Sequence, residues 1–217
     1  MNLEKEAAEY SCGIHWKGKK CYAYGTSLTS ISQGKYIPYL AQLSGLEIVN
    51  RGIPGGGITN LGGYSKGQVK HEIMNLYDGK AEADLILFEV GANEGGELGN
   101  LFDADDMTFC GCLNQCLRYL LQHTDAQIAV IPSSVAQETK EIYYQRLFKL
   151  EEVCKMNRVY FLGHADGLGQ YRIAKDHRFV VDHIHQTEIG GYNRALAIWS
   201  QLKHVPLLYT ELDPSLL

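Results

Sequence analysis

The sequence contains no long apolar run. A helix that crosses a bilayer needs about 20 consecutive apolar residues, and no stretch of this chain approaches that length. The N-terminal segment 1–10 is acidic and polar, and it lacks the basic region followed by an apolar core that marks a secretion signal. The sequence as written therefore predicts a cytoplasmic protein with no membrane partner. The alternative that a secretion signal preceded this sequence and was removed stays open.

The sequence also lacks an excess of positive charge. It has 20 Lys and Arg against 25 Asp and Glu, which gives a formal net charge of -5. Proteins that bind nucleic acid usually concentrate basic residues on one face. Here a short basic cluster, Lys17, Lys19 and Lys20, directly precedes a predicted strand, and we expect it to be a solvated strand entry. No nucleic-acid partner is expected.

Common motifs of metal and nucleotide sites are missing as well. The six cysteines do not form the paired CxxC motifs of a zinc site. The glycine-rich segments have neither the GxGxxG order after the first strand nor the lysine of a P-loop, so no cofactor is expected. We expect buried free thiols, as in a reducing compartment. Two alternatives stay open: a Cys12–Cys21 disulfide, and a metal held by Cys110, Cys112 and Cys116.

The residues that are present predict one α/β domain over 1–217, with a polar lead-in at 1–19 and a tail at 206–217. A chain of 217 residues with 45% hydrophobic and 21% charged residues is long enough and apolar enough for a sizeable core. Strands are expected at 20–24, 46–49, 83–90, 127–131 and 159–162. Helices are expected at 34–43, 68–77, 107–122, 141–157 and 187–203. This alternation predicts a three-layer α/β/α sandwich around a central, mainly parallel five-stranded sheet.

Apolar spacing predicts which side chains the last helix buries. Its expected buried stripe is Ile189, Tyr192, Leu196 and Trp199. Two segments carry no such periodicity: 97–106 has the composition of an acidic insertion, and 163–178 is irregular and could overhang a ligand site.

Polar residues occur in four segments that the topology would bring together. Ser27 follows the first predicted strand, Gly55 the second and Asn93 the third, while Asp182 and His185 precede the last helix. In a doubly wound sheet the strand-to-helix loops open at one edge, where ligands bind. The sequence therefore predicts that these five residues share a site.

These residue types are those that acyl transfer to a serine requires. Ser27 would be the nucleophile, His185 could take its proton, and Asp182, three residues away, could orient the imidazole. The oxyanion of the tetrahedral intermediate needs hydrogen-bond donors. The backbone N–H groups of Ser27 and Gly55 and the side-chain amide of Asn93 could provide them.

Each residue also has a simpler interpretation. Ser27 could be a helix N-cap, and Asn93 could be a turn residue. Gly55 could serve only a tight turn, and the adjacent Gly56 and Gly57 leave the register of the donor open by a residue.

A metal site is a further alternative at the end of the chain. Asp182, His183, His185 and the nearby His177 form a reasonable ligand set. No motif adds another ligand, and the serine mechanism uses the same residues, so no metal is expected.

The sequence resembles the SGNH (GDSL-type) serine hydrolases in four short blocks, which occur in the family's order and span nearly the whole chain. Residues 25–28 (Gly-Thr-Ser-Leu) resemble the first block, Gly-Asp-Ser-Leu, and residues 50–55 (Asn-Arg-Gly-Ile-Pro-Gly) resemble the second. Residues 91–94 (Gly-Ala-Asn-Glu) resemble the third, Gly-x-Asn-Asp, and residues 182–185 (Asp-His-Ile-His) resemble the final Asp-x-x-His. The resemblance implies a flavodoxin-like fold and the same catalytic and oxyanion-hole residues.

The blocks depart from the family at three positions. Thr26 stands where the family has an aspartate beside the nucleophile, and Glu94 replaces the aspartate after the asparagine. Gln186 follows the histidine where the family often has proline. None of these is a triad position, so the resemblance still implies the chemistry, with a different arrangement of hydrogen bonds around Ser27.

The function that the resemblance implies is a serine esterase acting on small acyl esters, with O-acetyl groups on carbohydrate as the leading substrate class. The expected partner is a small-molecule or carbohydrate ester. Four aromatic residues in or near the loops could stack on a sugar or pack within the loops: Tyr64, Phe102, Tyr171 and Phe179. The alternatives are a non-catalytic carbohydrate-binding protein on the same fold, an acyltransferase or thioesterase of the same family, and a metal-dependent hydrolase.

Overall fold

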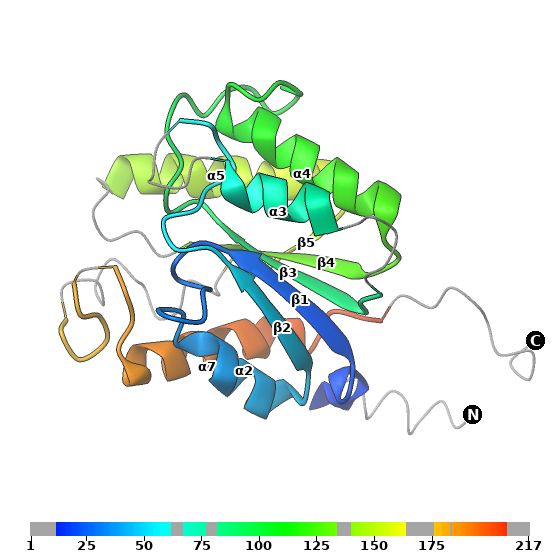
Figure 1. The fold of residues 1–217 in the computed structure, drawn as a ribbon, viewed down its shortest axis with the longest axis vertical. Helices are drawn as coiled ribbons and strands as arrows, with labels where there is room; N and C mark the ends of the chain where they lie inside the picture. The colour runs from blue at the N-terminus through cyan, green and yellow to red at the C-terminus, as the bar shows by residue number, and fades with distance from the viewer. Residues whose placement is uncertain are drawn as a thin grey trace, which may run out of the picture.

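The computed structural model describes residues 12–61, 67–76, 82–133, 140–163, 176–182 and 184–207. A parallel sheet lies between two layers of helices (Figure 1). Its strands are β1 (Lys20–Gly25), β2 (Glu47–Gly52), β3 (Leu85–Val90), β4 (Gln127–Pro132) and β5 (Tyr160–Phe161). The helices are η1 (Ile14–Trp16, 3-10), α2 (Tyr36–Ser44), α3 (Gln68–Leu76), α4 (Phe109–His123), α5 (Lys140–Asn157) and α7 (Glu188–Leu202). The predicted α/β sandwich with a parallel five-stranded sheet is confirmed.

The strand order is β2-β1-β3-β4-β5, and every pairing is parallel. The chain runs outward from β1 to the edge strand β2, then crosses back to pair β3 on the other side of β1. The order therefore reverses between β1 and β3, and in sheets of this kind ligands bind at that switch point, outside the carboxyl ends of the strands. The loops after β1 and β3 contain Ser27 and Asn93.

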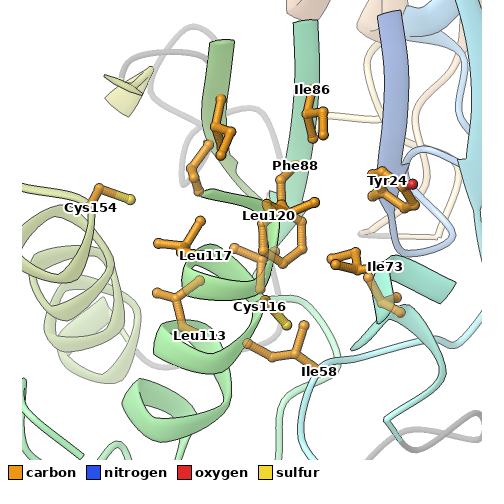
Figure 2. Close-up of a cluster of buried hydrophobic side chains, with 14 of the residues drawn as sticks. Tyr24, Ile58, Ile73, Ile86, Phe88, Leu113, Cys116, Leu117, Leu120 and Cys154 are labelled. Atoms are coloured by element: carbon orange, nitrogen blue, oxygen red, sulfur yellow. The ribbon is translucent and has the colours of Figure 1, made fainter. Parts of the chain in front are cut away.

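Alternate residues of the central strands face opposite helix layers. Helices α3, α4 and α5 cover one face, and α2 and α7 cover the other (Figure 1). On the first face, Tyr24 and Phe88 pack with Leu117 and Leu120 of α4 and Ile73 of α3 (Figure 2). The opposite face contains the alternate residues: Cys21, Ala23, Leu85, Leu87, Ala129 and Ile131. Both faces are covered, which explains why β1, β3 and β4 are continuous apolar runs in the sequence.

The predicted buried stripe of α7 is wrong. Ile189, Tyr192 and Leu196 are 58%, 43% and 38% exposed, and Trp199 is only partly buried. The helix instead buries Gly190, Gly191, Arg194, Ala195, Ile198 and Leu202. Its glycines allow close approach to the start of α2, because a Cβ at Gly191 would lie 2.4 Å from the Cβ of Lys35, the N-cap of α2.

The N-terminal lead-in is not wholly polar as predicted. Ile14–Trp16 forms η1, and the Trp16 side chain is fully buried between the sheet and the end of α7. Its indole Nε1–H donates to the Leu202 carbonyl at 3.1 Å. Trp16 therefore belongs to the core of the fold, while 1–11 lie outside the described residues.

Five of the cysteines are buried thiols, as predicted: Cys21, Cys110, Cys112, Cys116 and Cys154. Cys12 is exposed, contrary to that prediction, and it forms no disulfide with Cys21. Burial raises the pKa of Cys112 to about 11, and it raises the pKa of Cys116 further. These side chains pack as small apolar groups.

The segment predicted as an acidic insertion forms part of the approach to α4. The Phe109 and Cys110 N–H groups donate to the carbonyls of Glu97 and Leu98, both at 3.0 Å. Thr108 caps α4 by accepting from the Gly111 N–H at 3.1 Å, so the helix begins two residues later than the expected Met107. Within the described residues, no helix has the length and apolar character required to cross a membrane.

Candidate active site

The turn after β1 carries Ser27 at the carboxyl edge of the sheet. The Thr29 and Ser30 N–H groups donate to the Thr26 carbonyl at 3.1 and 3.0 Å, which folds the chain back just beyond the strand. Ser27 is 7% exposed. The next α-helix begins at Tyr36 and its N-cap is Lys35, so the alternative interpretation of Ser27 as a helix cap is wrong.

Ser27 and His185 are 158 residues apart in the sequence and in hydrogen-bond contact in the fold. The His185 Nε2 lies 3.0 Å from the Ser27 Oγ, and its Nδ1 lies 2.7 Å from Asp182 Oδ2. With Nδ1 protonated, the imidazole donates to Asp182 and accepts from the Ser27 hydroxyl. This is the direction of proton flow that a serine nucleophile needs.

Asp182 is held by more than the imidazole. Its Oδ1 accepts from the backbone N–H groups of Ile184 and His185 at 3.1 and 2.8 Å. Partial burial alone would raise the pKa of Asp182, but the hydrogen bonds from the His185 ring and from these two N–H groups outweigh it and lower the pKa to about 2. Asp182 is therefore a carboxylate at neutral pH.

The segment around His185 is a short reversed turn attached to α7. The Val181 N–H donates to the His185 carbonyl at 2.8 Å, and Val180 bridges Gln186 in antiparallel fashion. Thr187 then caps α7 by accepting from the Gly190 N–H at 3.1 Å. The helix cap and the turn together fix the direction in which the imidazole enters the site.

The glycine-rich loop after β2 is joined to the turn that carries Ser27. The Asn50 amide donates to the Thr29 carbonyl at 2.6 Å, and the Ile53 N–H donates to the Gly25 carbonyl at 2.8 Å. A Cβ at Gly52 would lie 2.3 Å from the Ser30 nitrogen, so only glycine fits there. Farther along this loop, Gly55 has a φ of +68°, which favours glycine as well.

Asn93 faces this loop from the end of β3. Its Nδ2 donates to the Gly56 carbonyl at 2.9 Å, which leaves the second hydrogen of the amide for another acceptor. Asn93 and the glycine loop are thus brought together. The turn interpretations of Gly55 and Asn93 are compatible with the site, since both residues also shape the backbone here.

Glu94 joins the loop after β3 to the glycine-rich loop by hydrogen bonds. Its Oε2 accepts from the backbone N–H groups of Ile58 and Thr59, both at 3.0 Å. In return, the Thr59 hydroxyl accepts from the Gly95 N–H at 3.2 Å. Burial raises the pKa of Glu94, although these hydrogen bonds partly oppose it.

The sequence interpretation missed Glu89, which is fully buried beneath the turn that carries Ser27. Its Oε2 accepts from the Thr26 N–H at 2.7 Å and from the Thr26 hydroxyl at 2.9 Å. The Thr29 hydroxyl at 3.2 Å and the Ser133 hydroxyl complete the set of donors. The available signal was a single carboxylate within the apolar run 85–90, since such a residue is almost never fully buried without partners.

The metal alternative gains no support from this geometry. Both ring nitrogens of His185 are engaged, by Asp182 and Ser27. Among the residues that the structure describes, no group of three or more His, Cys, Asp or Glu side chains is placed to hold a metal ion. His183 lies outside those residues.

The four aromatic candidates for sugar stacking have different outcomes. Phe102 is 77% exposed on the segment before α4. Phe179 is partly buried and lies under the Arg178 guanidinium, 5.4 Å from its ring centroid. Tyr64 and Tyr171 lie outside the described residues.

No protein-family model matches the sequence, and no curated protein matches it. Solved structures do share its fold. Axe2, an acetylxylan esterase from Geobacillus stearothermophilus, aligns with a TM-score of 0.57 at 16% identity over 86% of this chain and 94% of its own. A putative GDSL-like lipase from Bacteroides uniformis aligns with a TM-score of 0.61 at 14% identity over 88% of this chain and 99% of its own. Three other Axe2 structures are catalytic mutants in which a serine, an aspartate or a histidine is replaced by alanine.

Proposed function

We propose that the protein is a serine esterase that hydrolyses small acyl esters. The observation that carries the proposal is the chain of two hydrogen bonds from Ser27 Oγ through the His185 ring to the Asp182 carboxylate. Its position at the switch point of the sheet, and the likeness in fold to an acetylxylan esterase and a GDSL-like lipase, support the same conclusion.

In the proposed first step, the Ser27 Oγ attacks the ester carbonyl while His185 Nε2 takes the hydroxyl proton. Asp182 stabilises the imidazolium that forms and keeps the ring in the correct tautomer. The tetrahedral intermediate then collapses, the C–O bond to the alcohol breaks, and the alcohol leaves with the proton from His185. An acyl group remains on Ser27.

In the second step, water attacks the acyl carbonyl while His185 Nε2 takes its proton. The bond between the acyl carbon and Ser27 Oγ then breaks, Ser27 receives the proton from His185, and the acid leaves. The oxyanion of each intermediate would accept from the backbone N–H groups of Ser27 and Gly55 and from the second amide hydrogen of Asn93. Such a donor typically contributes a factor of about 10² to 10³ in kcat.

As substrates we propose O-acetyl groups on carbohydrate. The acetylxylan esterase among the similar structures supports this class. An assay across acetylated sugars and p-nitrophenyl esters of increasing acyl length tests it. Highest kcat/KM for acetyl esters is expected, and a preference for long acyl chains would contradict it.

The Ser27→Ala variant tests the mechanism. We expect the wild type to turn over p-nitrophenyl acetate and to be labelled once by a fluorophosphonate, with Ser27 as the labelled residue by mass spectrometry. Ser27→Ala should lose both properties while unfolding at the same urea concentration. Equal rates in the two proteins would refute the serine mechanism, and sugar binding without turnover or labelling would favour the non-catalytic alternative.

A further inference from the structure

Thr26 and Glu89 form a buried pair directly beside the proposed nucleophile. Thr26 is 1% exposed and Glu89 is fully buried. One carboxylate oxygen, Oε2, accepts from both the backbone N–H and the hydroxyl of Thr26. The position of residue 26, and with it the start of the turn that carries Ser27, is thus set by a side chain from β3.

The Thr26 hydroxyl both donates and accepts a hydrogen bond at this position. It donates to Glu89 Oε2 at 2.9 Å, and it accepts from the Leu28 N–H at 3.2 Å. An ionised carboxylate accepts but cannot donate. An aspartate at position 26 could accept from Leu28, but it would face Glu89 with a second negative charge in a buried site, which is strongly unfavourable.

We infer that Thr26 and Glu89 act as one unit that positions Ser27, with the carboxylate supplied by β3 and the hydroxyl by the turn after β1. This inference rests on the proposed function, because positioning matters only if Ser27 is the nucleophile.

Glu89 is a positioning residue, since its contacts are with Thr26, Thr29 and Ser133 and it acts on Ser27 through the backbone. The unit extends into the α2 side of the core, where the Tyr36 hydroxyl lies 3.0 Å from the Thr29 hydroxyl. The same buried region contains Arg194 of α7, whose guanidinium lies 5.1 Å from the centre of the Tyr36 ring.

Arg194 also donates to the Pro132 carbonyl at 3.1 Å, next to Ser133. A positive charge is therefore buried close to the carboxylate, and it lies on the helix that follows His185. The unit around Glu89 thus connects the ends of β1, β3 and β4 to α7, the helix that follows the proposed base.

The test uses two sets of variants. Thr26→Ser keeps the hydroxyl and Thr26→Val removes it with little change in volume. Thr26→Asp restores the aspartate of the family's first block, alone and together with Glu89→Gln. Thr124→Val is the matched control, because the Thr124 hydroxyl also accepts a backbone N–H, from Ala126 at 3.0 Å, but lies beyond the end of α4.

For p-nitrophenyl acetate we expect kcat/KM within about threefold of wild type for Thr26→Ser and Thr124→Val, and a loss of at least about tenfold for Thr26→Val and Thr26→Asp. Adding Glu89→Gln to Thr26→Asp should recover at least about threefold of the loss, because it removes the opposing charge. A loss in the double variant that equals or exceeds the loss in Thr26→Asp would contradict this coupling. Urea unfolding of each variant confirms that the protein is folded at the assay temperature.

A second readout does not need turnover. The ¹⁵N NMR signal of His185 Nε2 reports its hydrogen bond with Ser27, and Ser27→Ala gives its value when that bond is broken. Thr26→Asp should move the signal toward that value, and the double variant should move it back. Identical signals in Thr26→Asp and the double variant, or no change in either, would overturn the inference.

The two hypotheses fail differently. A wild type that neither turns over esters nor reacts with fluorophosphonate refutes the proposed function, while the NMR comparison still decides whether Glu89 and Thr26 position Ser27. Activity that depends on Ser27 but shows no coupling between positions 26 and 89 refutes only the inference.

Discussion

Replacing Asp182 by Asn should abolish most of the activity, because it would force the wrong tautomer on His185. Asp182 accepts at both oxygens: Oδ1 from the N–H groups of Ile184 and His185, and Oδ2 from the imidazole Nδ1–H. An asparagine has one oxygen and one NH₂ group, so it can satisfy only one of these two sides. The outcome depends on whether the asparagine oxygen faces the two backbone N–H groups or the imidazole Nδ1.

The structure indicates that the asparagine oxygen would keep the hydrogen bonds from the backbone N–H groups of Ile184 and His185. An asparagine that turned its oxygen toward His185 would oppose its NH₂ group to two backbone N–H groups and lose two hydrogen bonds, together about 2 kcal/mol, or about thirtyfold in population. The favoured orientation directs the NH₂ group at Nδ1, which must then be unprotonated. Nε2 then carries the hydrogen and can no longer accept the Ser27 proton.

The same substitution in a serine protease triad lowers kcat about 10⁴-fold. Because the Asp182 side chain is 56% exposed, water can replace part of the lost bonding, and we expect a loss of about 10³- to 10⁴-fold. Each tenfold step corresponds to about 1.4 kcal/mol of activation free energy, so the expected increase is about 4 to 5.5 kcal/mol. The measurement is kcat for p-nitrophenyl acetate.

Asp176→Asn is the matched control. Asp176 lies on the neighbouring turn, and hydrogen bonds from Arg178 are the main cause that lowers its pKa to about 2. Its substitution should leave kcat within about twofold. A folded Asp182→Asn protein that keeps more than about a tenth of the wild-type kcat would refute the tautomer argument.

The pH dependence of stability gives an independent check on Asp182. Its pKa is lowered from 3.8 to about 2 on folding, so the unfolded chain takes up the proton first as the pH falls. The stabilisation from the carboxylate is therefore fully present above about pH 5 and is lost between about pH 4 and 2. The difference in unfolding free energy between wild type and Asp182→Asn should shrink over that interval, and a difference that is constant down to pH 2 would contradict the lowered pKa.

Two further predictions concern Glu94 and Gly190. Burial raises the pKa of Glu94 above 4.5, so the folded protein keeps this proton to a higher pH than the unfolded chain and loses stability as the pH rises through that window. Glu94→Gln can still accept from the backbone but does not titrate at this position. Its urea midpoint relative to that of the wild type should therefore increase from pH 4 to pH 7. A difference that stays constant would count against the raised pKa. A Cβ at Gly190 would lie 2.0 Å from the Phe179 carbonyl oxygen, so Gly190→Ala should cost about 1 to 3 kcal/mol of unfolding free energy. Ser200→Ala, at an exposed position of the same helix, should change it by less than about 0.5 kcal/mol, and equal urea midpoints for the two variants would refute the packing argument.

The strands were predictable because burial on both faces leaves a simple signature in the sequence. Residues 85–90 and 127–131 are apolar almost throughout, and the structure covers them from both sides. The end of β2 was missed because its last three residues, Asn50, Arg51 and Gly52, are not strand formers. They are in the strand because they pair in parallel with Ala23, Tyr24 and Gly25 of β1, and a pairing partner cannot be read from local sequence.

The buried face of α7 could not be predicted from apolar periodicity alone. The helix has an apolar stripe and a second stripe of glycine, alanine and arginine at the same spacing, and periodicity favours the first. The second stripe is the one that is buried, because Gly191 lets α7 pack closely against the start of α2 at Lys35. Arg194 is buried there because a guanidinium can pack over the Tyr36 ring and donate to a carbonyl.

The position of the candidate site followed from topology, but its hydrogen bonds did not. Parallel strands put Ser27, Asn93 and the glycine loop at one edge whatever their side chains do. That Asn93 donates to Gly56, or that Glu89 accepts from Thr26, depends on the register between strands. Because register is a property of the pairing and not of either strand, the roles of residues 89 and 94 became apparent only in the structure.

The hydrogen bonds suggest how the parts of the site depend on one another. The turn after β1 is bonded to β2 through Asn50 and to β3 through Glu89, and the loop after β3 is bonded to the loop after β2 through Glu94. Displacing the turn after β1 would therefore break contacts with both neighbouring strands. His185 reaches these loops from a turn of its own, through its hydrogen bond to Ser27 and the packing of α7 beneath. The distance between Ser27 Oγ and His185 Nε2 therefore depends on how α7 packs. Under the proposed function, we expect the close-packed glycines of that helix to affect activity.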